Sequence, residues 1–94
     1  MAKLYVTEFA ESDINSAKEP PLADQSFTFT GTSTQCSNAF NARTRLVRIH
    51  TDAICSIVFA KDPTATADNR RLAINSTEYF SVEGGLKVAA ITNT

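Results

Sequence analysis

Glycine is scarce in this sequence and occurs only at positions 31, 84 and 85. A phosphate-binding loop or a dinucleotide-binding fingerprint needs several closely spaced glycines, so the sequence excludes both motifs. The G-x-S-x-G turn that carries the nucleophilic serine of many hydrolases is absent as well. The chain therefore lacks the commonest motifs of nucleotide-binding proteins and of serine hydrolases.

Histidine and cysteine are also few: His50, Cys36 and Cys55 are the only ones. Their spacing matches none of the ligand pairs of zinc sites, so we expect His50 to be structural. Cys55 lies in the most apolar stretch of the chain, where a thiol is unreactive, which disfavours a cysteine nucleophile. A single disulfide is one alternative, but without a secretory leader we expect two buried thiols. The sequence predicts no enzyme activity, no cofactor and no metal site.

Long apolar runs and an excess of one charge are missing too. No run approaches the roughly 20 residues that span a bilayer, and the N-terminal MAKLYVTEF has no apolar core of a signal peptide, which favours synthesis in the cytoplasm. The 9 basic and 10 acidic residues give a net charge of -1 and are interspersed. This balance argues against binding to nucleic acid or to a membrane.

Residues typical of β-strands are plentiful, and several stretches alternate between apolar and polar side chains. In the stretch RLVRIHT, Val47 and Ile49 share one face, and Arg48 and His50 share the other. The pattern predicts strands at residues 3–9, 26–30, 45–51, 54–60, 71–74, 78–82 and 86–91, whereas residues 37–44 allow at most a turn or two of helix. We therefore expect one all-β domain over residues 1–94, a compact antiparallel β-sandwich or small barrel of seven to eight short strands.

Two short links in this pattern predict tight hairpins. One is Asp52-Ala53, between the third and fourth predicted strands, and the other is the turn at residues 83–85, which contains two glycines. The strand at 54–60 is apolar on both faces, which is typical of the centre of a sheet or of a subunit contact.

Residues 10–25 form a long polar segment that contains Pro20-Pro21 and lacks either periodicity. We expect it to be a loop that orders on a partner, with Pro20, Pro21 and Leu22 as the apolar contact; a surface loop without a role is the alternative. A second polar loop is predicted at residues 60–70.

Arginines provide the other candidate contacts. Arg43, Arg45 and Arg48 form a basic grouping near the third predicted strand. Salt bridges at the rim of the domain explain them, and so does an acidic patch on another protein, because arginine is enriched at protein interfaces. No stacking aromatic residues are interleaved with them, which disfavours nucleic acid.

The stretch of residues 44–92 resembles small virion proteins of tailed bacteriophages. The resemblance rests on the segments Val47-Arg48-Ile49-His50, Asp52-Ala53, Cys55-Ser56-Ile57, Phe59, Asp62-Pro63-Thr64-Ala65-Thr66, Glu78-Tyr79-Phe80 and Lys87-Val88-Ala89. Ala60-Lys61 departs from the pattern, in which a glycine is usual. The resemblance covers about half of the chain, carries no catalytic residues and implies a structural role associated with the phage head.

We therefore expect a capsid decoration or cement protein, located on the virion surface and bound to the major capsid protein or other virion proteins, and we expect it to form homo-oligomers. A tail or head–tail connector subunit is one alternative, which the number of copies per particle would distinguish. A carbohydrate-binding module of a host-recognition structure is another, although zero tryptophans and only two tyrosines provide few aromatic platforms for a sugar.

Overall fold

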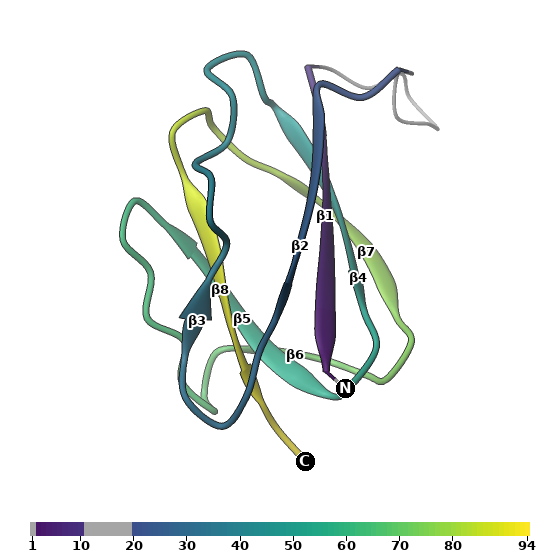
Figure 1. The fold of residues 1–94 in the computed structure, drawn as a ribbon, viewed down its shortest axis with the longest axis vertical. Coiled ribbons are helices and arrows are strands. Elements are labelled where there is room, and N and C mark those ends of the chain that lie inside the picture. Colours follow the sequence, from purple (N-terminus) through teal and green to yellow (C-terminus); the bar gives the residue numbers. More distant parts are fainter. Residues whose placement is uncertain (1, 11–19) are drawn as a thin grey trace.

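The computed structural model describes residues 2–10 and 20–94 of the chain. They form eight strands in two four-stranded antiparallel sheets that face each other as a sandwich (Figure 1). The first sheet has the order β2-β1-β4-β7, and the second has the order β3-β8-β5-β6. The strands are β1 (Lys3–Phe9), β2 (Ala23–Thr28), β3 (Thr34–Gln35), β4 (Leu46–Thr51), β5 (Cys55–Ala60), β6 (Arg70–Leu72), β7 (Thr77–Ser81) and β8 (Lys87–Thr92).

The fold class expected from the sequence is confirmed, and each of the seven predicted strands has a counterpart within three residues of its expected ends. The two-residue strand β3 was not placed by the pattern, because two residues are too few to show a period. Residues 37–44 form turns and irregular structure rather than helix, and no helix that could cross a membrane occurs in the described ranges. Strand β2 begins at Ala23, so the connection predicted for residues 10–25 ends earlier than expected.

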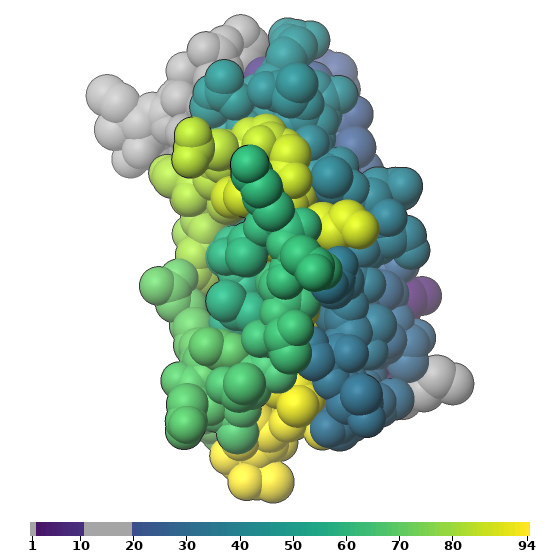
Figure 2. Space-filling model, turned by 90° about the vertical axis from the view of Figure 1, so that its left-hand side faces the viewer, coloured from purple at the N-terminus to yellow at the C-terminus, as the bar shows by residue number. Residues whose placement is uncertain are grey.

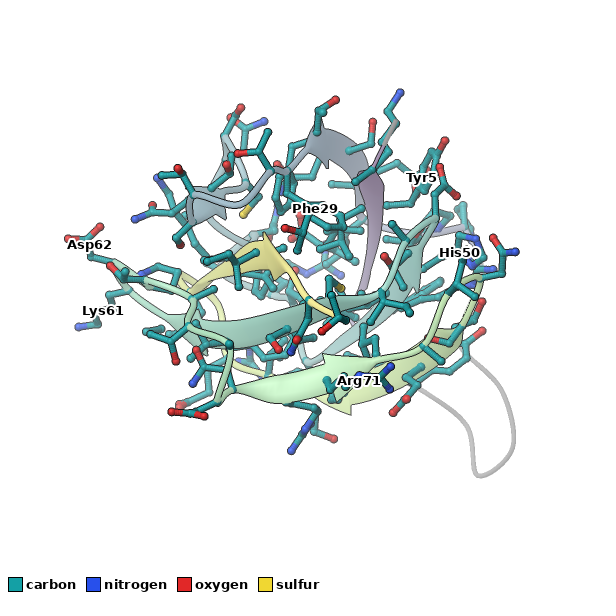
Figure 3. All side chains as sticks on the ribbon, turned by 90° about the horizontal axis from the view of Figure 1, so that it is seen from below. Tyr5, Phe29, His50, Lys61, Asp62 and Arg71 are labelled. Carbon is teal, nitrogen blue, oxygen red and sulfur yellow. The ribbon has the colours of Figure 1, made fainter. Side chains whose placement is uncertain are left out.

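The core lies between the two sheets and follows the predicted alternation. Val47 and Ile49 of β4 are fully buried and face Cys55 and Ile57 of β5 across the interior. Phe29, which follows β2, fills the space between the sheets and is 1 % exposed (Figure 3).

The hairpin predicted at Asp52-Ala53 is wrong, because β4 pairs with β1 and β7 whereas β5 pairs with β8 and β6. The link carries the chain from one sheet to the other. Thr51 is buried and its hydroxyl donates to the carbonyl of Ala53 at 2.6 Å, which turns the chain locally. Because the chain crosses between the sheets, the apolar side of β4 faces the apolar side of β5 across the core. In a hairpin the two strands would lie side by side in one sheet.

The second predicted hairpin, at residues 83–85, is wrong for the same reason: β7 and β8 belong to different sheets. Both glycines are nevertheless required there, for two different reasons. Gly85 adopts φ +86°, which side chains disfavour. At Gly84 a Cβ atom would lie 2.6 Å from the Cα of Ala42, so the backbone of residues 41–42 leaves no room for a side chain.

Candidate binding surface

The two outer faces of the sandwich differ in what covers them. The loop between β5 and β6, residues 61–69, folds back across the outer face of the second sheet, and we call it the strap. Figure 2 shows this green segment lying in front of the yellow strand β8. Pro63 and Ala65 of the strap are buried, and so are Ser56 and Ala89 on the sheet below.

Hydrogen bonds fix the strap at both ends. Near β3, the side-chain amide of Gln35 donates to the carboxylate of Asp62 at 2.6 Å, and the amide of Ala65 donates to the hydroxyl of Ser33 at 2.7 Å. Near β6, the carbonyl of Ala67 accepts from the side chains of Ser56 and Asn93. The apolar character of both faces of β5 thus has an internal explanation: one face covers the core and the other lies under the chain's own loop.

The outer face of the first sheet is not covered in this way by the described residues. The register places Tyr5 of β1 beside His50 of β4, and Thr7 beside Arg48. On the far side of β4, Arg48 pairs with Tyr79 of β7, and His50 pairs with Thr77. Residues 5, 7, 48, 50, 77 and 79 form one surface, which we call the tyrosine face. It carries both tyrosines and the only histidine of the chain.

A shallow hollow of about 620 Å³ lies on the tyrosine face, over β2, β1 and β4. Its lining includes Tyr5, Asp24, Arg48, His50 and Asp52. The ring of Tyr5, 39 % exposed, lies 6.0 Å from that of His50 (Figure 3). The hollow therefore combines one aromatic platform with groups that donate and accept hydrogen bonds and that carry both signs of charge.

Neighbouring side chains hold His50 in place. Its Nδ1 lies 2.8 Å from the hydroxyl of Thr77, and its Nε2 lies 3.6 Å from the carboxylate of Asp52. The hydrogen bond to Thr77 and the neighbouring ring of Tyr5 orient the half-buried His50 on this face. In the described part of the chain no three His, Cys, Asp or Glu side chains are grouped to hold a metal ion.

The structure separates the arginines that the sequence grouped together. Arg48 lies in the hollow on the tyrosine face. Arg45 precedes β4 and folds onto its own loop, where its guanidinium donates to the carbonyls of Ala42 and Thr44. Arg43 is exposed on that loop, at one end of the sandwich.

The candidate contact Pro20, Pro21 and Leu22 lies directly before β2, whereas residues 11–19 of the predicted loop are outside the described ranges. Pro20 is exposed, and Pro21 and Leu22 are half-buried. The amide of Leu22 donates to the carbonyl of Glu8 at 2.7 Å, so this segment adjoins the end of β1. It reaches neither the hollow lining nor Arg48.

Sequence reasoning missed Tyr5 and Tyr79 as candidate contacts. The alternation in β4 did place Arg48 and His50 on the face opposite Val47 and Ile49, but no exposed face was assigned to residues 3–9. What the sequence did not show is the strand order β1-β4-β7, which brings the outer faces of these strands together. Because β1 and β7 are far apart in the chain, only the three-dimensional pairing joins the two tyrosines into one surface.

The two cysteines are free and buried, as predicted. The Cys36 thiol donates to the carbonyl of Asn38 at 3.4 Å, and the Cys55 thiol donates to the hydroxyl of Thr51 at 3.5 Å. Burial raises the pKa of both thiols above the ordinary 9.0, because the thiolate is poorly solvated inside the core. At neutral pH both groups are therefore protonated and unreactive.

This shift predicts a fall in stability at alkaline pH. A thiol whose pKa is higher in the folded state stabilises the protein fully below its unfolded-state pKa, and this contribution is lost as pH rises toward the folded-state pKa. We expect the free energy of unfolding, measured in urea, to decrease between about pH 8 and pH 10. The double variant C36A/C55A will be less stable at pH 7 but should show a flatter decrease, and an equal slope would contradict the assignment to the thiols.

Comparisons of the chain with protein-family models, with curated proteins and with solved structures found no match in any of the three.

Proposed function

We propose that this chain is a non-enzymatic structural protein of a tailed-bacteriophage virion, a capsid decoration or cement protein that binds the outer head lattice through its tyrosine face. The resemblance of residues 44–92 to small virion proteins suggests the setting. The partner is then the major capsid protein or a neighbouring virion protein, and the chain acts by contact alone.

One observation carries the binding part of this proposal. The strap covers the outer face of the second sheet over Ser56 and Ala89, whereas the tyrosine face presents Tyr5 and Tyr79 to solvent beside the half-buried Arg48. Tyrosine and arginine are, with tryptophan, the residues enriched among those that dominate the binding energy of protein interfaces. A sheet also loses little backbone entropy on binding, since its strands are already held by their hydrogen-bond ladders.

Charge reversal on each side of the molecule tests the proposal. We expect Arg48→Glu to weaken binding to particles that lack this protein by tenfold or more, about 1.4 kcal/mol. Lys61→Glu is the matched control, because it makes the same change of charge in the strap, on the side away from Tyr5 and His50 (Figure 3). Co-sedimentation with particles measures both. Equal weakening by the two variants would show that the tyrosine face is not the contact.

The number of bound copies separates the decoration role from the alternative of a tail or connector subunit. A decoration protein should reach on the order of hundreds of copies per particle, as the symmetry of a head requires. A count equal to one small ring would instead place the chain in a tail or connector.

The hollow supports a second candidate, a carbohydrate-binding module. Tyr5 offers an aromatic ring, with the carboxylates of Asp24 and Asp52 and the guanidinium of Arg48 in the same lining. Titration calorimetry against a panel of bacterial surface glycans tests it. Binding that Tyr5→Ala abolishes and Lys61→Glu preserves would favour this function, and no heat with any glycan would exclude it for the panel.

A further inference from the structure

Strand β7 lies at an edge of the first sheet. One side of it pairs with β4, and no strand of residues 2–10 or 20–94 pairs with its other side. Four of its five residues are exposed, and Tyr79 is 54 % exposed. An open edge of this kind offers unpaired backbone N–H and C=O groups to another strand.

Two hydrogen bonds to β4 or the residue before it, one just beyond each end of β7, show which backbone groups of β7 face β4 and which point outward. The amide of Val82 donates to the carbonyl of Arg45 at 3.0 Å, and the amide of Thr51 donates to the carbonyl of Ser76 at 3.1 Å. Since hydrogen-bonded pairs alternate along an antiparallel ladder, Glu78 and Phe80 also direct their backbone groups toward β4. The N–H and C=O groups of Thr77, Tyr79 and Ser81 therefore point away from the sheet.

We propose that the open edge of β7 binds β7 of a second copy of this chain, antiparallel and with the two-fold axis at Tyr79. In this register Tyr79 pairs with Tyr79, and Thr77 pairs with Ser81 of the second copy. All six outward N–H and C=O groups of each strand are then hydrogen-bonded. The two first sheets become one continuous eight-stranded sheet. This inference goes beyond the proposed function, because it concerns contact between copies rather than attachment to a particle.

The side chains fit the same register on both faces. On the tyrosine face, two tyrosine rings meet across the axis, and hydroxyl-bearing Thr77 and Ser81 face each other, both favourable cross-strand pairs. On the opposite face, Glu78 lies across from Phe80 of the second copy and not from another Glu78. The guanidinium of Arg70 lies 4.9 Å from the ring centroid of Phe80. Each Glu78 carboxylate therefore approaches an Arg70 of the other copy.

The other sheet edges are less suited to pairing. Strand β3 has two residues and β6 has three. At the β2 edge, the side chain of Gln25 exchanges two hydrogen bonds with the backbone of Asn38, which brings the loop at residues 38–41 alongside the start of the strand. Among the strands and loops that the structure describes, β7 thus has the longest open edge without an adjoining loop.

Cysteine crosslinking of the full-length protein tests the register. We expect Tyr79→Cys to give a disulfide-linked dimer under mild oxidation, because paired Cα atoms lie about 5.5 Å apart and a disulfide spans that distance. Thr77→Cys and Ser81→Cys are the matched controls: each faces a different residue of the second copy, so each should crosslink far less. Cys36 and Cys55 are buried and do not interfere. Equal crosslinking at all three positions, or none at Tyr79→Cys, would overturn the proposal.

Charge reversal provides an independent measurement without a crosslink. Sedimentation equilibrium should show Glu78→Lys and Arg70→Glu each weakening the dimer several-fold, because each places like charges together across the axis. The double variant E78K/R70E should recover most of the loss. A wild-type protein that stays monomeric at high concentration, or a double variant weaker than both single variants, would contradict the pairing.

Discussion

Replacing Phe29 with alanine should lower the free energy of unfolding by about 3 to 5 kcal/mol. The ring of Phe29 is 1 % exposed and belongs to the core cluster between the two sheets. Its backbone is also held, since its amide donates to the carbonyl of Ala2 at 3.1 Å. The walls of the resulting cavity are β-strands fixed by their ladders, so they can collapse only partly around the lost ring. Urea unfolding followed by circular dichroism measures the loss.

Ile74→Ala is the control for this prediction. Ile74 is 58 % exposed in the turn between β6 and β7, so its truncation should change the free energy of unfolding by no more than about 0.5 kcal/mol. Because a small domain has roughly 5 to 15 kcal/mol of stability in all, Phe29→Ala removes a large share of it. Similar losses in the two variants would contradict the position of Phe29 at the centre of the sandwich.

Replacing Gly84 with alanine should cost about 3 kcal/mol, at the upper end of the range for overpacking. The added Cβ atom would lie 2.6 to 2.7 Å from backbone atoms of Asn41 and Ala42. These atoms cannot retreat freely, because the carboxylate of Glu8 accepts hydrogen bonds from the amide of Asn41 and the hydroxyl of Thr44, both at 2.7 Å. Moving the loop away from Gly84 would break bonds to a carboxylate that is buried.

Gly85→Ala separates steric clash from backbone strain in the same turn. At Gly85 a Cβ atom meets nothing within 4 Å, but φ is +86°. Alanine there should cost about 1 kcal/mol, from the disfavoured backbone conformation alone. Thermal unfolding of the two variants tests the order. If Gly85→Ala were the more damaging substitution, the close approach of residues 41–42 to Gly84 would be wrong.

The strands were predictable from the sequence because a strand with one buried face leaves a period of two, as in Val47 and Ile49 against Arg48 and His50. Pairing was not predictable in the same way. A two-residue link such as Asp52-Ala53 fits a hairpin and a crossing between sheets equally well. What decides for the crossing is the strand pairing: β4 pairs with β1 and β7, and β5 pairs with β8. These partners are far from β4 and β5 in the sequence, so a local pattern does not reveal them.

The candidate site was predictable only in part, for a related reason. Arg48 was identified by its charge, and it does line the hollow. Its grouping with Arg43 and Arg45 reflected closeness along the chain, whereas β4 carries Arg48 away from the loop that holds the other two. The apolar outer side of β5 suggested a subunit contact. In the structure the strap, which is mostly polar in sequence, covers this side of β5 with Pro63 and Ala65.

The strap covers the side of the molecule opposite the tyrosine face, and this limits how many layers of the protein can form on the surface of a particle. A subunit that attaches through the tyrosine face turns its strap outward, and the strap repeats none of the features of the tyrosine face. A second subunit then finds no site on top of the first. Adsorption should therefore saturate at a layer one molecule thick, with a fixed stoichiometry however high the free concentration rises.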